Sequence, residues 1–424
     1  MPRPGTILPA LAVLACALLL PAQASGATQE HALASKLARA MRGAGFYSGA
    51  FVYNATDRHP VFALRSRRTR ILASNTKLFT TTSALLRFGP LARLHTRVLG
   101  RGVLDPEGTF HGDLYLRGGG DPTFGSRRFV GRNYRRGATI QTLAGRVQAA
   151  GINAVDGHVY GDESLFDRRR GGPASRFRTS VWIGPLSALD YNRGLADERG
   201  TAFQRRPAKF AALRLRAVLA RRGIHTGTAG VARTPSSAQP LATVDSPSMA
   251  RLIQLTNKPS DNFFAEMLLK DVAAFATGKG TTARGARLAR RSARQFGSFA
   301  RLADGAGLSR RDRASPYRIA RLLLGMRARP EFPAFYGSLS IAGRDGTLAP
   351  RMRRGPAHRH CRGKTGTLSN VSALSGYCKA RSGDVYVFSI LMNNVTVDSA
   401  RRLQDRMAQA IAAVRAPAGV SSNR

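Results

Sequence analysis

The chain has 424 residues, of which 43% are hydrophobic and 21% are charged, and this excludes a largely disordered or collagen-like protein. The 67 basic residues outnumber the 24 acidic ones and give a formal net charge of +43, which favours anionic surroundings. Because the arginines are spread along the whole chain, we interpret most of this excess as solvated surface charge and expect no dedicated nucleic-acid binding.

The N-terminus has the pattern of an export signal. Arg3 precedes an apolar run over residues 7–20, and the small residues Ala22 and Ala24 then flank Gln23 as in a cleavage site. We therefore predict a signal peptide at residues 1–24 and an exported mature protein. Outside the cell membrane, its charge favours peripheral contact with anionic envelope surfaces.

Helical and strand patterns alternate along the chain, which predicts a mixed α and β fold. For example, Leu33, Leu37 and Met41 recur at a spacing of four and indicate a helix at residues 31–42. The segments 111–115 and 156–160 resemble each other, so we expect neighbouring strands there. The other predicted elements are strands at 48–53, 61–64, 96–99, 113–116 and 384–393, helices at 73–86, 211–222, 249–256, 262–275, 283–295, 316–326 and 399–414, and a Pro/Ser linker at 234–242.

Cys361 and Cys378 lie in two strand-like runs around a polar turn. A hairpin centred between Ser369 and Asn370 places the two cysteines directly opposite each other, close enough for a disulfide. In an oxidising compartment we expect this bond to form. Two free buried thiols are the alternative.

Three short motifs carry the chemistry, and the first is Ser74-Asn75-Thr76-Lys77. Residues i and i+3 share one face of a helix, so the Lys77 amine can reach the Ser74 hydroxyl. A lysine in a dry pocket can be neutral enough to take the proton of a serine nucleophile. By itself, the motif is equally typical of a helix cap followed by a surface lysine.

The second motif is Ser260-Asp261-Asn262, between two predicted helices. Ser260 can relay a proton to a leaving group, and Asn262 can hold a substrate amide or the lysine. These residue types also favour a helix N-cap, and the two roles are compatible.

The third motif is Lys364-Thr365-Gly366-Thr367, at the start of the predicted hairpin. A glycine in an edge strand lets an extended peptide approach the backbone. The N–H groups of Thr367 and Ser74 can form an oxyanion hole, and Lys364 supplies positive potential for a substrate carboxylate. The alternative is a plain edge strand with a protective lysine.

In this order on one chain, the motifs resemble the signature of the penicillin-recognising serine acyltransferases. The separation of Lys77 from Ser260 is far longer than in a compact class A β-lactamase. The sequence resembles the penicillin-binding protein 4 type of D-alanyl-D-alanine carboxypeptidase/endopeptidase, peptidase family S13, which has an extra domain between the first two motifs. Further blocks that look like this family are residues 73–78, 115–122, 304–309, 343–348 and 374–377.

The resemblance implies an α/β (mixed α+β) serine β-lactamase/penicillin-binding-protein-like transpeptidase fold with an inserted β-rich domain. We expect a discontinuous peptidase domain at residues 25–95 and 245–415, the inserted part at 96–244 and a disordered tail at 416–424. The implied location is the bacterial periplasm.

The implied activity is that of a serine-type D-Ala-D-Ala carboxypeptidase, with endopeptidase activity as an addition, acting on peptidoglycan stem peptides and acylated by β-lactams. Ser74 is the implied nucleophile and Lys77 the base, while Ser260 and Lys364 help to protonate the departing amine. Asn262 completes the catalytic set, and Thr365, Gly366 and Thr367 bind the substrate. No metal or other cofactor is implied.

Two alternatives share the fold. A β-lactamase or esterase would have the same acylation apparatus but would deacylate β-lactams rapidly. A catalytically inactive cell-wall-binding homologue would keep the fold and the charge without turnover.

Overall fold

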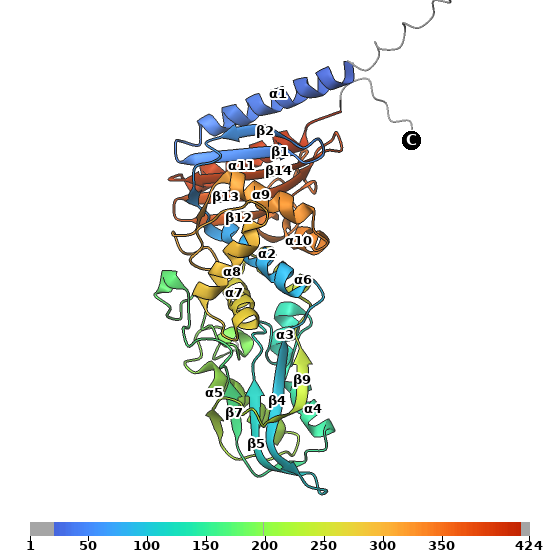
Figure 1. Cartoon of the computed structure of the whole chain (residues 1–424), viewed down its shortest axis with the longest axis vertical. Helices are drawn as coiled ribbons and strands as arrows, with labels where there is room; N and C mark the ends of the chain where they lie inside the picture. The colour runs from blue at the N-terminus through green and yellow to red at the C-terminus, as the bar shows by residue number, and fades with distance from the viewer. Residues whose placement is uncertain (1–20, 198, 417–424) are drawn as a thin grey trace, which may run out of the picture.

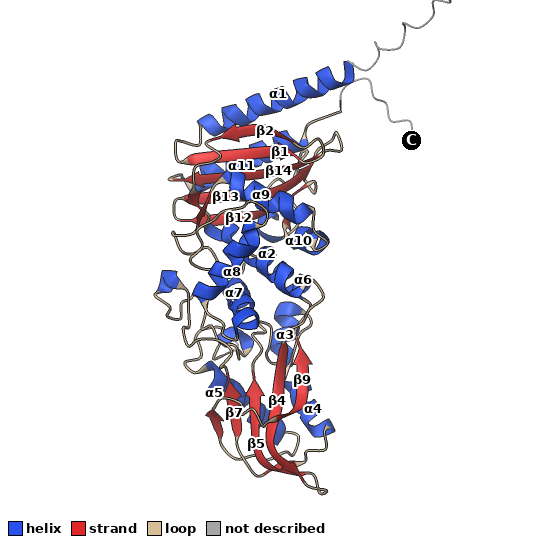
Figure 2. Cartoon of the chain, viewed as in Figure 1, coloured by secondary structure: helices blue, strands red, loops and turns tan. Residues whose placement is uncertain are grey.

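The computed structural model describes residues 21–197 and 199–416. Most of the predicted signal peptide and of the predicted tail therefore lies outside the described residues. The molecule is elongated, with one sheet near each end and a layer of helices between them (Figures 1 and 2). No helix of the described ranges is both long and apolar enough to cross a bilayer.

The first sheet is antiparallel and has the strand order β11-β12-β13-β14-β1-β2. Strand β14 alternates between its two faces: Phe388 and Ile390 point to one hydrophobic cluster, and Val387 and Leu391 point to another. The sheet is therefore buried on both sides. Its strands are β1 Ser48–Asn54, β2 His59–Leu64, β11 Ser340–Ile341, β12 Cys361–Leu368, β13 Val371–Lys379 and β14 Val385–Asn393.

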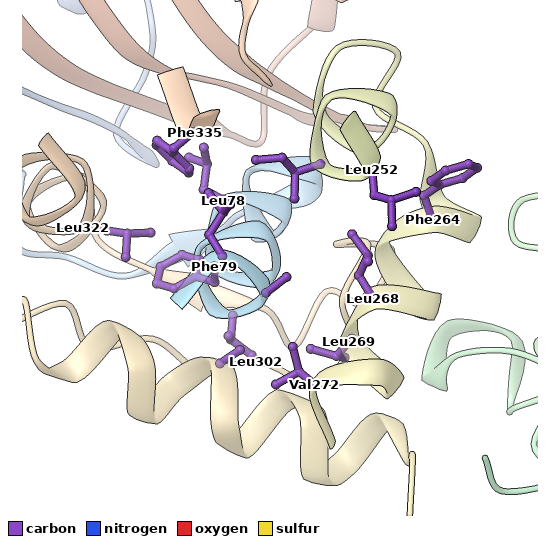
Figure 3. Packing of buried hydrophobic residues seen from close by; sticks show 14 of the residues in the cluster. Leu78, Phe79, Leu252, Phe264, Leu268, Leu269, Val272, Leu302, Leu322 and Phe335 are labelled. Atoms are coloured by element: carbon purple, nitrogen blue, oxygen red, sulfur yellow. The ribbon is translucent and has the colours of Figure 1, made fainter. Parts of the chain in front are cut away.

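Helices α1 (Pro21–Arg42) and α11 (Val397–Ala412) cover one face of this sheet. The predicted spacing of Leu33, Leu37 and Met41 on α1 is confirmed, since all three are buried there. The other face carries a helical core, in which α2 is buried nearly all round (Figure 3). The helices of this core are α2 Thr76–Phe88, α6 Met249–Asn257, α7 Asn262–Thr277, α8 Thr282–Arg294, α9 Pro316–Arg327 and α10 Phe332–Ser338.

The second sheet has the order β8-β7-β5-β4-β9, with β6 beside β5. The two similar segments are neighbouring strands as predicted, because Leu114 pairs with Val159 and Tyr115 with Tyr160, and the structure shows that they run parallel. Helices α4 and α5 supply apolar side chains to its core. The elements of this region are β4 His95–Leu104, β5 Thr109–Arg117, β6 Ala154–Val155, β7 Val159–Asp162, β8 Ala229–Val231, β9 Gln239–Asp245, α3 Arg127–Tyr134, α4 Ile140–Ala149 and α5 Pro207–Ala220.

The predicted linker at residues 234–242 is wrong in its second half, which belongs to strand β9. Ala242 and Val244 pair with β4 and point into the core of the second sheet. Pro240 is accommodated because β9 is an edge strand and the register shifts there. The sequence patterns also missed the helices α3, α4 and α10.

Short elements connect the main ones. The segment Ala73–Asn75 is a single 3-10 turn, η1, directly before α2, so the predicted helix at 73–86 begins as a tighter turn. The remaining short elements are the strand pair β3 Arg70–Ile71 and β10 Arg313–Ala314, and the 3-10 turns η2 Pro173–Ser175, η3 Asn192–Gly194 and η4 Gly346–Leu348.

The β12–β13 hairpin has the predicted register, with Cys361 opposite Cys378. Their Sγ atoms are joined in a disulfide of 2.01 Å. The bond lies at the end of β12 that is distant from the motif residues Thr365 to Thr367, so it fixes the base of the hairpin.

Candidate active site

The three sequence motifs meet at one cavity of about 780 Å³ between η1, the start of α7 and strand β12. Ser74, Ser260 and Asn262 line it together with the β12 residues Thr365 to Leu368. Lys77 and Lys364 lie behind this lining, each with a fully buried side chain. The fold therefore brings together all the motif residues that we singled out, although they are up to 293 residues apart in the sequence (Ser74 to Thr367).

Lys77 is held against Ser74 by three hydrogen bonds from its ammonium. Nζ donates to Ser74 Oγ at 2.9 Å, to Asn262 Oδ1 at 2.7 Å and to the Ala306 carbonyl at 2.6 Å. Burial lowers the pKa of Lys77 to about 8, and nearby carboxylates, with Asp304 the strongest, act in the opposite direction. Lys77 is therefore close to Ser74 and easily deprotonated.

The Ala306 carbonyl is itself positioned by a buried carboxyl that the sequence analysis missed. Oε1 of Glu266, one helical turn after Asn262 on α7, accepts the N–H groups of Gly305 and Ala306, both at 2.8 Å. Burial, together with Asp304, raises the pKa of Glu266 to about 8. The 304–309 block was visible in the sequence, but nothing there indicated its partner on α7.

Lys364 forms the second lysine–serine pair of the site. Its Nζ donates to Ser260 Oγ and to the Thr365 carbonyl, both at 2.9 Å. Burial, and secondarily the charge of Lys77, hold the pKa of Lys364 well below its usual range. Both lysines thus favour the neutral form more than a solvated lysine does.

Strand β12 runs along η1 with an open edge. Strand β11 pairs only with Arg362 and Gly363, so the stretch from Lys364 onward has no strand on that side among the described residues. A Cβ at Gly366 would lie 2.8 Å from the Leu72 carbonyl oxygen and 3.1 Å from the Ser74 nitrogen. Only glycine lets β12 approach the backbone of Ser74 this closely.

The second motif is clamped from the inserted part of the chain. Arg193 on η3 donates to both carboxylate oxygens of Asp261, at 2.5 and 3.3 Å. Oδ1 of Asp261 also caps α7 by accepting the Phe264 N–H at 3.0 Å. The N-cap expected at this motif is therefore present, and it is made by Asp261, between the two residues that reach the cavity.

Other wall residues were not found from the sequence. Trp182, the single tryptophan of the chain, lies in the wall with 70% of its surface exposed, and its carbonyl accepts Asn262 Nδ2 at 3.2 Å. Arg351 and Arg401 add positive charge, and Arg401 donates to Thr367 Oγ1 at 3.3 Å. The sequence could not single out Arg351 and Arg401 among the many arginines of the chain, and Trp182 is not part of any recognisable motif.

Comparison with known proteins finds carboxypeptidases among the relatives of this chain. Over 452 aligned residues, the chain is 27% identical to a D-alanyl-D-alanine carboxypeptidase of Actinomadura sp. (strain R39), covering 87% of this chain and 81% of the relative. It is 30% identical to a carboxypeptidase of Mycobacterium tuberculosis, over 76% of this chain and 70% of the relative.

The fold is shared with penicillin-binding protein 4 of Haemophilus influenzae, with a TM-score of 0.74 at 19% identity, covering 88% of this chain and 97% of that one. That protein has also been solved in complex with a β-lactam. The family model of the D-Ala-D-Ala carboxypeptidase 3 (S13) family matches residues 29–204 and 197–414. The chain therefore belongs to the D-Ala-D-Ala carboxypeptidase 3 (S13) family.

Proposed function

We propose that the cavity is the active site of a serine D-Ala-D-Ala carboxypeptidase in which Ser74 is the nucleophile and Lys77 its general base. The observation that carries this assignment is the buried Lys77 Nζ, 2.9 Å from Ser74 Oγ. Membership of the S13 family supports the reaction class, and the contacts of this chain support the roles of its residues.

Acylation begins when neutral Lys77 takes the Ser74 proton. The Ser74 oxygen attacks the carbonyl carbon of the penultimate D-Ala, and backbone N–H groups of Ser74 and Thr367 hold the resulting oxyanion. The close approach permitted by Gly366 brings these two segments together. Asn262 keeps the Lys77 amine in place through its Oδ1.

The departing amine of the terminal D-Ala needs a proton when the C–N bond breaks. Ser260 delivers it, and Lys364 Nζ, 2.9 Å from Ser260 Oγ, replaces it. The substrate carboxylate binds beside Thr365 and Thr367, and its negative charge stabilises the ammonium form of Lys364. After acylation, Lys77 releases the Ser74 proton to solvent and Lys364 regains a proton from solvent. Neutral Lys77 then takes a proton from the water that attacks the acyl carbonyl and passes it to the departing Ser74 oxygen, which releases the shortened peptide and restores Ser74.

Covalent labelling with a fluorescent penicillin tests the nucleophile. The wild type should carry label after denaturation, Ser74→Ala should carry none, and Ser369→Ala should label normally because Ser369 lines the same cavity without contacting either lysine. Equal labelling of Ser74→Ala and wild type would refute the assignment. Destruction of the antibiotic without stable labelling would instead identify a β-lactamase.

Digestion of purified muropeptides separates the two peptidase activities. Release of free D-Ala from pentapeptides reports carboxypeptidase activity, and conversion of cross-linked dimers to monomers reports endopeptidase activity. Labelled protein that releases neither product would be a binding protein and not a peptidase.

An action on cell-wall peptides is extracytoplasmic, and we propose the periplasm as the compartment. The charged start, apolar run and small-residue site at residues 1–24 support export, and the Cys361–Cys378 disulfide is suited to an oxidising compartment. N-terminal sequencing of the secreted protein should give Ser25 as the first residue. A mature chain that retains residues 1–24 would contradict this location.

A further inference from the structure

A second large cavity, of about 830 Å³, lies between the inserted sheet and the C-terminal end of α7. Its walls come from the end of β7, the start of α5, strand β8 and the residues after α7, several of which are labelled in the lower half of Figure 1. We call it the cationic cavity, because seven lysine or arginine side chains and only two carboxylates line it.

Both carboxylates of the cationic cavity are already committed to partners in its wall. Asp162 accepts hydrogen bonds from the Thr234 backbone and hydroxyl at 2.9 and 2.6 Å. Glu163 binds Arg170 through two contacts of 2.6 and 2.5 Å. Glu163 pairs with Arg170, and Asp162 keeps its negative charge, so seven positive charges face two negative ones in the cavity.

Five of the seven cations have no hydrogen bond or ion pair with any residue that the structure describes. They are Arg168, Arg205, Arg206, Lys209 and Arg233. The positive charges around the cationic cavity repel each other, and the low-dielectric protein walls concentrate the positive electrostatic potential inside it. This arrangement favours an anionic ligand with several charged groups, and guanidinium groups match the planar carboxylate through paired hydrogen bonds.

The cationic cavity is separate from the catalytic one. Asn262 begins α7 at the catalytic cavity, and Lys279 follows the end of α7 in the cationic cavity. A helix of 16 residues is about 24 Å long, so the two cavities are about that far apart. A single short peptide bound at Ser74 does not reach this far, whereas a polymer that carries many stem peptides does.

We propose that the cationic cavity binds carboxylate groups of peptidoglycan stem peptides next to the one being cleaved. Each stem peptide ends in a carboxylate, so the polymeric substrate presents a series of anionic groups. Binding at the cationic cavity holds the polymer while Ser74 acts on another chain end. The proposal rests on the proposed function and adds a second contact with the same substrate.

The test compares two variants of the full-length mature protein. The cavity variant carries Arg205→Gln, Arg206→Gln, Lys209→Gln and Arg233→Gln. The control variant removes the same charge from the outer side of α8 through Arg284→Gln, Arg287→Gln, Arg291→Gln and Arg294→Gln. All eight side chains lie at least partly at the surface, so both variants should fold, and fluorescent penicillin labelling checks that the catalytic cavity is intact.

Release of D-Ala is measured from a soluble D-Ala-D-Ala peptide and from insoluble peptidoglycan stripped of phosphate polymers. We expect unchanged kcat and KM on the peptide for both variants. On peptidoglycan at low salt, the apparent KM of the cavity variant should rise about tenfold, the combined effect of several exposed ion pairs, while the control changes less than twofold. Raising the salt concentration should bring the apparent KM of the wild type on peptidoglycan close to that of the cavity variant, because salt screens exposed charges.

Two results would overturn the proposal. One is an equal KM of the cavity variant and the control on phosphate-free peptidoglycan, and the other is an effect of salt on this KM that is the same for wild type and cavity variant. A wild type that releases D-Ala from neither substrate would refute the proposed function itself. Binding of inorganic polyphosphate by the wild type, without any difference on phosphate-free peptidoglycan, would assign the cavity to a phosphate ligand.

Discussion

The pKa of Lys77 predicts how fast Ser74 is acylated at each pH. Burial lowers this pKa from 10.5 to about 8, which corresponds to about 3 kcal/mol in favour of the neutral amine. At pH 7 about one lysine in ten is then neutral, against about one in three thousand for a solvated lysine. Because only the neutral amine accepts the Ser74 proton, burial raises the fraction of the enzyme that is ready for acylation at pH 7 by about 300-fold.

The second-order rate constant for acylation by penicillin measures this directly. It should rise about tenfold per pH unit between pH 5 and 7 and level off above pH 8. Lys77→Arg keeps its positive charge throughout, so it should acylate at least about 1000-fold more slowly and without this rise. Circular dichroism at each pH controls for unfolding.

A rate constant that stays flat between pH 5 and 8 would refute this reasoning. So would a midpoint near pH 10, because it would show that burial does not shift the Lys77 pKa in the working enzyme.

Three further outcomes are expected. Gly366→Ala should lower the acylation rate constant at least tenfold with a modest loss of melting temperature, whereas Gly363→Ala on the same strand, away from the nucleophile, should cost stability without a comparable loss of rate. Arg193→Ala should lower the free energy of unfolding by about 2 kcal/mol and slow acylation, because Asp261 loses its partner; unchanged acylation would show that the clamp has no role in catalysis. As the pH rises from 5 to 8, the free energy of unfolding of Glu266→Gln, measured with urea, should increase by about 3 kcal/mol relative to that of the wild type. The reason is that the wild-type carboxyl ionises in the unfolded chain but stays largely protonated in the fold. If the free energies of the two proteins changed in parallel with pH, the raised pKa would be contradicted.

The fold class and the family were predictable because the evidence for them is local. The β12–β13 hairpin needs only a turn and an even register, and the similarity of two segments predicted that β5 and β7 are neighbours, although not that they run parallel. The linker prediction failed for a related reason. Proline and serine at 234–242 indicated a loop, but pairing with β4 outweighs that composition, and only the three-dimensional sheet shows the pairing.

The site was predictable to the level of its motifs and no further. Spacing on a helix placed Lys77 beside Ser74, and the contact is present. The contacts that set the chemistry come from distant segments: Ala306 and Asn262 hold the amine, and Glu266 holds the loop that carries Ala306. No single-residue pattern marks such a contact, because a buried glutamate looks like an ordinary helix-forming residue in a sequence.

Several residues of the site have backbone angles or burial that are unusual for their residue type. Ala73, next to Ser74, and Ser260, in the second motif, have left-handed backbones with φ of 46° and 62°. The side chains of Lys77 and Lys364 are fully buried. Each left-handed backbone costs about 1–3 kcal/mol in isolation, and burial removes the hydration that would stabilise each ammonium. The helical core on α2 and α7 offsets that cost, and it also supplies the dry surroundings that lower the Lys77 pKa. Activity therefore depends on the packing of this core, since water that reached Lys77 would restore its usual pKa before the chain had unfolded.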